Sequence, residues 1–407
     1  EVITMQLIPR KEYLDWLCRW QDKQIIKVVS GVRRCGKSTM FTLFKQNLLK
    51  RGVDEKQIIS INFEAMEFEA LRDYHTLYQY INDHLQQECK NYIFLDEVQH
   101  CTEYQKAVDS LFIKDNCDIY LTGSNAYFMS GELATVLSGR YVELKMLPLS
   151  FKEFVSSFAP ENVDISIQEK FNLYLNYGSF PFLARYNSFD SDAYNYLRDV
   201  YNTIILNDIV KRLKITDVNA LDKVTQFIAD NIGNIVSINK IANTLKSGGK
   251  SIDNKTVEKY LQGLVDALFL YKAPRFNIKG KQLLTNLPKY YIVDIGMRNI
   301  LIRNKESDIG HIIENLAYLE LMRRGYDVYV GDIDKGEVDF VAIKKNQTEY
   351  YQISATTLNP DTLARELAPL QSVQDNYPKY RLTLDELFGE ANYNGIQKKN
   401  LIKWLLE

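Results

Sequence analysis

Residues 25–39 read IIKVVSGVRRCGKST, and this stretch decides the fold expected for the chain. It opens with an apolar, largely β-branched run that predicts a buried strand, and the amphipathic stretch 40–52 that follows it predicts a helix. Between the two, Gly31 and residues 36–38 (GKS) are spaced as in the phosphate-loop pattern G-x-x-x-x-G-K-[ST]. This order of elements predicts a nucleotide phosphate site. A glycine turn that matches by chance is the alternative, and the flanking strand and helix disfavour it.

The loop is expected to hold ATP together with Mg²⁺. Its glycines allow backbone N–H groups and the start of the next helix to converge on phosphate oxygens. Lys37 is expected to reach the β- and γ-phosphates, and the Ser38 hydroxyl to ligate Mg²⁺. The side chains of Arg33 and Arg34 either add positive charge near the nucleotide or point into solvent. The residues expected to bind the nucleotide are Gly31, Arg33, Arg34, Cys35, Gly36, Lys37, Ser38 and Thr39.

A second apolar strand, NYIFLDE at 91–97, ends in two carboxylates. Ligands of open α/β sheets bind at the carboxyl ends of the strands, so Asp96 and Glu97 are expected beside the phosphates. We assign Asp96 to the metal and Glu97 to the attacking water, because phosphoryl transfer to water needs both roles. A simple polar strand end is the alternative.

Two further polar features follow along the chain. The predicted strand 117–125 ends in Thr122, Ser124 and Asn125, which are suited to hydrogen-bond the γ-phosphate or the water. Arg140 follows a predicted short helix, and it would stabilise charge on the transferring phosphoryl group, from the same subunit or from a neighbour. A solvated arginine at the edge of a strand is the competing interpretation.

The composition predicts a soluble, cytoplasmic protein of two or three domains. The 407 residues carry a formal net charge of -2, which gives no overall attraction to nucleic acid. The five cysteines form no metal-ligand pattern, which indicates a reducing compartment and no structural zinc. Cys35 is either an oxidisable thiol of lowered pKa or a small filler of the loop. Apolar runs are too short to span a bilayer, so no membrane is expected.

The motifs together resemble a known family. GVRRCGKST, FLDEVQ, LTGSNA, the GRY at 139–141 and LPLSFKEF are similar to a prokaryotic AAA+ family in which the ATPase is fused to a conserved C-terminal domain of unknown function. The resemblance implies a parallel-sheet P-loop core, Asn125 as the first sensor and Arg140 at the arginine-finger position. Arg140 at that position would be consistent with a site shared between identical subunits, and therefore with a homo-oligomer. We find no second-sensor arginine in a lid.

The middle of the chain predicts a partner-binding module. After an ATPase core at 1–158 and a helical lid or linker at 159–232, residues 233–300 read as helix, turn, helix and strand, which fits a winged helix. Double-stranded DNA would be read by the start of the second helix, with phosphates bound by Lys246, Lys250, Lys255, Lys259 and Lys272. A protein-docking module is the alternative, because the surface is only mildly basic.

The tail at 301–407 resembles the restriction-endonuclease-like α/β fold, with Glu314 on a helix and Asp339 on a strand. Where nucleases of that fold carry an acid and a lysine, the chain has Gln352 and Ser354, so we expect the fold without cleavage. Glu314 and Asp339 would then be solvated or structurally paired.

Three functions follow from these expectations. The first is an ATPase whose nucleotide state controls C-terminal modules. The others are a nucleotide-gated switch with negligible turnover and an ATP-dependent nuclease.

Overall fold

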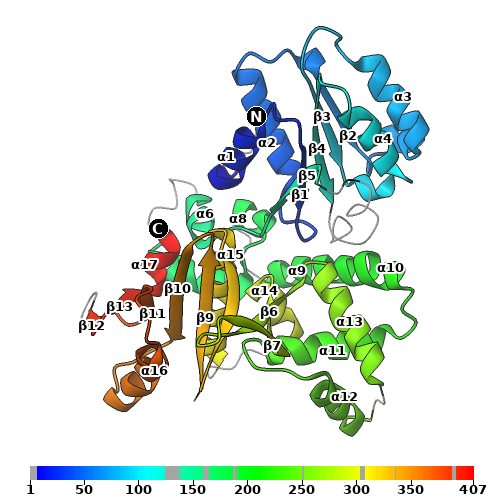
Figure 1. Cartoon of the computed structure of the whole chain (residues 1–407). Coiled ribbons are helices and arrows are strands. Elements are labelled where there is room, and N and C mark those ends of the chain that lie inside the picture. The colour runs from blue at the N-terminus through cyan, green and yellow to red at the C-terminus, as the bar shows by residue number, and fades with distance from the viewer. Residues whose placement is uncertain are drawn as a thin grey trace. The chain divides into compact units, whose positions relative to one another are not determined.

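The computed structural model describes residues 7–123, 137, 139–158, 165–186, 189, 191–249, 252–302, 308–334, 336–386 and 391–407, with the side chains of 186, 285 and 286 excepted. The chain forms two compact units (Figure 1). The first comprises Glu1–Pro148 with Asp266–Leu268, and the second comprises Leu149–Val265 with Phe269–Glu407. No helix among the described residues has the length and apolar character required to cross a membrane.

The first unit is built on a five-stranded parallel sheet in the order β2-β3-β4-β1-β5. Its central strands are buried along their whole length, as expected of a parallel sheet covered on both faces. This confirms the predicted P-loop sheet. The strands are β1 (Ile26–Ser30), β2 (Ile58–Asn62), β3 (Asn91–Asp96), β4 (Cys117–Gly123) and β5 (Tyr141–Lys145).

Helices cover both faces of this sheet (Figure 1). On one face, Phe41 and Phe44 of α2 (Lys37–Lys50) pack against Phe94 of β3. On the other face, alternate residues of the strands pack with apolar side chains of α3 (Tyr74–His84) and α4 (Tyr104–Phe112). The unit also contains α1 (Lys11–Trp20) and the 3-10 turns Glu55–Gln57, Met66–Leu71 and Val98–His100.

The second unit contains an eight-stranded mixed sheet in the order β12-β13-β11-β10-β9-β8-β6-β7. Its strands are β6 (Leu270–Asn277), β7 (Gln282–Ile292), β8 (Asp327–Ile333), β9 (Gly336–Lys344), β10 (Gln347–Ser354), β11 (Lys379–Thr383), β12 (Asn392–Tyr393) and β13 (Ile396–Asn400).

Helices of the second unit form a helical region and flank its sheet (Figure 1). They are α6 (Phe151–Ser156), α7 (Ile167–Tyr177), α8 (Pro181–Tyr186), α9 (Ser191–Thr203), a π-helix (Ile204–Val210), α10 (Lys211–Leu213), α11 (Val218–Asp230), α12 (Ile238–Ser247), α13 (Asn254–Asp266), α14 (Ile295–Leu301), α15 (Ile309–Arg323), α16 (Pro360–Ser372) and α17 (Leu401–Leu406).

The predicted helix, turn, helix and strand correspond to α12, α13 and β6, but β6 does not end a separate module. It pairs in parallel with β8 over Arg275–Asn277, so strands from the segments 233–300 and 301–407 share one sheet. An isolated two-stranded hairpin is marginal in water, and pairing with β8 completes the hydrogen bonds of β6. The structure therefore places no break at residue 300. The main segment of the first unit runs to Pro148, whereas the predicted core runs to 158. The four-part division remains a prediction.

Candidate active site

The phosphate loop lies between β1 and α2, and two of its glycines are required for different reasons. Gly36 has φ 105°, a left-handed conformation that favours glycine. Gly31 is required by space, because a Cβ there would lie 2.4 Å from the carbonyl oxygen of Met146 and 2.8 Å from Cys35 Sγ. The loop is thus held against the end of β5.

Lys37 is buried, and its ammonium group is fully engaged. Nζ donates to the carbonyls of Gly31 at 3.0 Å and Val32 at 3.4 Å, and it lies 3.4 Å from Glu97 Oε1. Burial alone would lower the pKa of Lys37, but the neighbouring Glu97, Cys35 and Asp96 together raise it above its ordinary value. Lys37 is therefore a cation that bonds two carbonyls of its own loop.

Asp96 lies at the end of β3 beside the start of α2. The Thr122 hydroxyl donates to Asp96 Oδ1, and the Ser38 hydroxyl also hydrogen-bonds this carboxylate. Burial raises the pKa of Asp96, and these two hydrogen bonds oppose the rise. The two residues predicted to hold Mg²⁺, Ser38 and Asp96, are therefore in contact.

Glu97 follows directly in a left-handed conformation with φ 52°. Its N–H donates to Thr122 Oγ1 at 2.9 Å, and its Oε2 accepts from Gln99 Nε2 at 2.5 Å. Burial raises the pKa of Glu97, but Lys37, the Gln99 hydrogen bond and Arg33 outweigh it, so that the pKa lies below the ordinary value. Glu97 is ionised at neutral pH, as a residue that orients or deprotonates water must be.

Comparison with known proteins gives the family of the chain. A family model described as "AAA domain" matches residues 23–155, and one described as a domain of unknown function (DUF8612) matches residues 168–308. An uncharacterized protein of Haemophilus influenzae is 37% identical over 406 residues, and the match spans 100% of both chains. The chain belongs to an AAA ATPase family with a C-terminal domain of unknown function.

One further relative of this AAA protein and one solved structure extend the comparison. An uncharacterized protein of Methanocaldococcus jannaschii is 29% identical over 394 residues, covering 92% of this chain and 82% of the relative. The solved structure of a Walker-type ATPase from Pyrococcus abyssi has a TM-score of 0.53 at 16% identity. It covers 72% of this chain and 96% of its own, and it supports the fold alone.

Two residues that the sequence reasoning missed lie at the same edge of the AAA sheet. Arg33 Nη1 is 3.2 Å from Glu64 Oε1, and His100 Nε2 is 3.9 Å from the same oxygen. Oxygens of Glu64 and Glu97 and a nitrogen of His100 lie within 4.8 Å of one another, as metal ligands could. However, Arg33 and Lys37 already neutralise the two carboxylates, which disfavours a further cation. The signal was available, since Glu64 follows β2 at the edge where β3 ends.

The remaining loop residues lie as follows. Arg34 is exposed, so its side chain points into solvent. Cys35 is buried, and burial raises the pKa of its thiol, which contradicts the oxidisable interpretation and favours a filler of the loop. Thr39 is half-buried in the first turn of α2. Ser124 and Asn125, with most of the predicted helix 131–140, lie outside the described residues.

Arg140 is far from its own phosphate loop. Its carbonyl accepts from the N–H of Ile26, the first residue of β1, whereas the loop follows the last residue of that strand. The side chain is ion-paired with Asp109 and lies over the Phe112 ring. Since β1 and β5 are parallel, Arg140 lies at the amino ends of these strands, whereas the phosphate loop lies at their carboxyl ends. This position contradicts a role in its own site, while a role in a neighbouring subunit remains a prediction.

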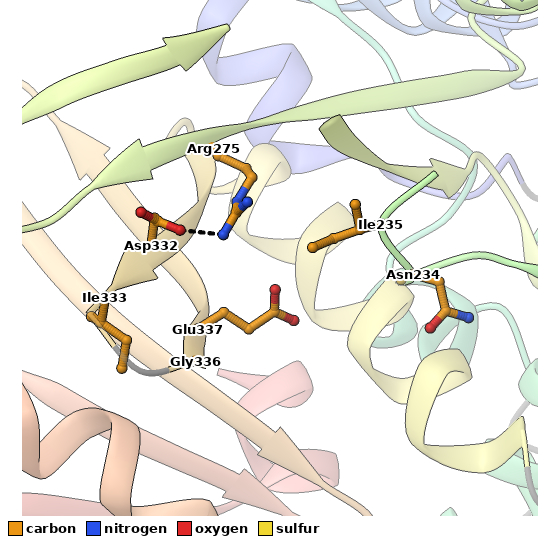
Figure 2. Close-up of a pocket in the computed structure, with 8 residues that line it drawn as sticks. Asn234, Ile235, Arg275, Asp332, Ile333, Gly336 and Glu337 are labelled. Carbon is orange, nitrogen blue, oxygen red and sulfur yellow. Dashed lines mark hydrogen bonds and ion pairs between the residues drawn. The ribbon is translucent and has the colours of Figure 1, made fainter. Parts of the chain in front are cut away.

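The second unit contains a polar pocket of about 580 Å³. Figure 2 shows Arg275 directed toward Asp332, with Glu337 beside them and Asn234 and Ile235 on the opposite wall. The pocket is lined by Gly233, Asn234, Ile235, Arg275, Asp332, Ile333, Gly336 and Glu337.

Behind Glu337 lies a buried charged cluster that the sequence did not predict. Lys289 Nζ is 2.6 Å from Glu337 Oε1 and 3.1 Å from Glu314 Oε1, and the Tyr291 hydroxyl donates to the same Glu314 oxygen at 2.7 Å. Lys289 is 3% exposed and comes from β7. The sequence has Ser354 where nucleases of this fold carry a lysine. Lys289 of β7 nevertheless places an ammonium group beside Glu314 and Glu337.

Asp339, the second predicted acid, is held differently. Its Oδ2 accepts from the Ile353 N–H at 2.7 Å, and Gln352 Oε1 accepts from the Asp339 N–H at 3.3 Å. Burial, and then the charge of Glu314, raise the pKa of Asp339 well above its ordinary value. The protonated form of Asp339 is thus favoured by its surroundings, while Glu314 is ion-paired with Lys289.

Proposed function

We propose that the first unit binds ATP with Mg²⁺ and hydrolyses it slowly. The observation that carries the proposal is the meeting of Lys37, Ser38, Asp96 and Glu97 at one edge of the parallel sheet, around a glycine-bordered loop. Lys37 and Glu97 have the charge states that their assigned roles need, and a bound cation would favour the ionised form of Asp96. The family membership supports the same reaction.

The proposed mechanism begins with an exchange of partners at Lys37. The triphosphate takes the ammonium from the carbonyls of Gly31 and Val32 and from Glu97. Glu97, still hydrogen-bonded by Gln99, then accepts a proton from the water that attacks the γ-phosphate. Ser38 and Asp96 would hold Mg²⁺, which would neutralise phosphate charge. One hydroxyl and one carboxylate are enough protein ligands for this ion, because it keeps several waters and also binds phosphate oxygens.

Replacement of the proposed base tests the mechanism. Glu97→Gln should bind ATP as the parent does, but it should release phosphate roughly 100-fold more slowly. Glu103→Gln, at an exposed carboxylate paired with Lys106, is the matched control and should turn over normally. Equal turnover by Glu97→Gln and the parent would refute the assignment. ATP binding without phosphate release by the parent would favour the switch without turnover.

We further propose that the nucleotide state controls binding of double-stranded DNA or a protein by the second unit, in the cytoplasm. The exposed lysines Lys255 and Lys259 near the start of α13 support DNA, and the free thiol state of all five cysteines supports a reducing compartment. Lys255→Ala with Lys259→Ala should weaken binding to duplex DNA and reduce its salt dependence. No binding to DNA by the parent would favour the protein partner.

We also propose that identical subunits assemble. Arg140 supports this proposal, because it lies at the amino ends of β1 and β5, away from the phosphate loop of its own chain. Arg140→Ala should lower turnover only under conditions in which the chain is oligomeric by mass photometry. An equal loss in the monomer would contradict it.

The buried Lys289 supports a second candidate function, an ATP-dependent nuclease in the second unit. Nuclease sites of the restriction-endonuclease-like kind use two acids and a lysine, and Glu314, Asp339 and Lys289 supply these groups. Nicking of supercoiled DNA with Mg²⁺ and ATP should then vanish in Asp339→Ala and persist in Asp327→Ala, at an exposed position of β8. Intact DNA after incubation with the parent would dismiss this candidate.

A further inference from the structure

Arg10, the residue before α1, has no role in the phosphate-loop pattern, yet it is 4% exposed and reaches the loop. Its Nη1 donates to the carbonyl of Cys35 at 3.0 Å. Its Nη2 donates to the carbonyls of Leu147 at 2.9 Å and Pro148 at 3.2 Å. One guanidinium thus joins the phosphate loop to the segment with which the first unit ends.

The guanidinium is fixed on its remaining sides. It lies 4.6 Å from the centre of the Tyr13 ring, and the Tyr13 hydroxyl accepts from the Leu147 N–H at 3.2 Å. The chain at 146 also touches the start of the loop, since the Met146 N–H donates to the Ser30 carbonyl at 2.7 Å. Arg10 therefore presents Nη1 to the loop from a rigid support, in the fixed fork geometry of arginine.

The bond to Cys35 determines which way the next N–H points. Peptide bonds of the described residues are trans, and in a trans peptide the C=O and N–H point in opposite directions. With the Cys35 carbonyl directed at Arg10, the Gly36 N–H is directed to the side away from Arg10. Gly36 belongs to the part of the phosphate-loop pattern whose backbone N–H groups bind phosphate oxygens.

We propose that Arg10 is a positioning residue of the nucleotide site. By holding the Cys35 carbonyl, it fixes the peptide between Cys35 and Gly36 in the orientation that offers the Gly36 N–H to a phosphate oxygen. Lys37 cannot do this in the loaded state, because its ammonium leaves the loop carbonyls for the phosphates. The phosphate part of this inference rests on the proposed function, whereas the orientation of the loop does not.

The test compares Arg10→Lys with Arg72→Lys in the full chain. Arg72 likewise donates from its guanidinium to a backbone carbonyl, but to that of Phe63, at 3.0 and 2.8 Å, and not to a residue of the loop 31–38. Lysine keeps the charge at position 10 but replaces the rigid, two-nitrogen fork of arginine with one rotatable ammonium group, which holds the Cys35 carbonyl less firmly. Without nucleotide, amides 34–38 should exchange hydrogen about tenfold faster in Arg10→Lys and at the parental rate in Arg72→Lys.

With nucleotide, Arg10→Lys should weaken both MgATP and MgADP about tenfold in calorimetry, because both carry the β-phosphate that the loop cradles. Tyr13→Phe, which leaves the Cys35 bond in place, should bind both within about twofold of the parent. Parental exchange in Arg10→Lys, or equal losses in Arg10→Lys and Arg72→Lys, would overturn the inference. Faster loop exchange in Arg10→Lys, with no triphosphate binding by the parent, would refute the proposed function instead and keep Arg10 as the residue that fixes the loop.

Discussion

Lys37 in the first unit and Lys289 in the second are both buried ammonium groups that face glutamates, but their other partners differ. Lys37 also bonds two neutral carbonyls of its own loop, and Arg33 lies nearby. Lys289 faces Glu314 and Glu337, with Asp339 beside them. Phosphate oxygens are able to replace neutral carbonyls around a cation, whereas the acid-rich surroundings of Lys289 repel an anion. The comparison teaches that a buried lysine marks a phosphate site only where its other partners are neutral.

Removing Lys289 should have the largest effect, on the stability of the second unit rather than on nucleotide binding. Lys289→Met leaves the buried Glu314 carboxylate, and the half-buried one of Glu337, without their cation, which should lower the free energy of unfolding by about 4 kcal/mol in denaturant titration. MgATP affinity of the folded fraction should stay at the parental value. A Lys289→Met chain of unchanged stability would break the comparison.

Acid pH should stabilise the second unit through Asp294, the N-cap of α14. Burial raises the pKa of Asp294 from 3.8 to about 6, although its oxygens accept from Ser179 and Met297. The folded state therefore binds the Asp294 proton more tightly than the unfolded state does. The resulting contribution to the free energy of unfolding is complete below about pH 4, and it is lost as pH rises through 6. It amounts to about 3 kcal/mol over the whole window.

The measurement is unfolding of the parent and of Asp294→Asn by denaturant at a series of pH values. The stability difference between the two should change in that window and be constant above it. Asp339 contributes in the same direction to both proteins and cancels in the difference. A difference independent of pH would contradict the assignment.

Removing Lys37 should weaken nucleotide binding by more than its effect on folding explains. Lys37→Met should weaken MgATP roughly 100-fold in calorimetry, because a charge-assisted contact to the phosphates is lost. Glu97 loses its cation as well, so the control is Lys37→Met combined with Glu97→Gln, which should recover stability but not affinity. Parental affinity in Lys37→Met would show that the loop does not bind phosphate.

The smallest expected effect separates the two loop arginines. Arg33 is one of the charges that keep the pKa of Glu97 low, whereas Arg34 is exposed. In Arg33→Gln the pKa of Glu97 should rise, and turnover at acid pH should fall a few-fold, with the acid limb of the pH–rate profile displaced to higher pH. Arg34→Gln should reproduce the parental profile. Identical profiles for both variants would remove Arg33 from the site.

The sequence was sufficient where the site is built from consecutive residues. The strand before Gly31, the loop and the helix after it follow from local spacing, and Asp96 and Glu97 follow from the rule that parallel strands end at one edge. Thr122, predicted as one of several polar residues, proves to bond both carboxylate residues.

Sequence reasoning failed where contacts join distant segments. Lys289 meets Glu314 only because β7 and α15 pack in one unit, and the pairing of β6 with β8 spans more than fifty residues. Arg10 reaches Cys35 across 25 positions and Leu147 across 137. Arg140 was placed by motif order, and only strand direction shows that it stands at the opposite edge. No local period or spacing encodes such neighbours.

The central claim is that the loop between β1 and α2 grips a triphosphate. Calorimetric titration of the full chain with ATP, with and without Mg²⁺, tests it most directly. We predict one site per chain whose affinity falls when Mg²⁺ is removed and collapses in Lys37→Met. Absence of binding heat from folded parent, or equal heats from parent and Lys37→Met, would contradict the claim.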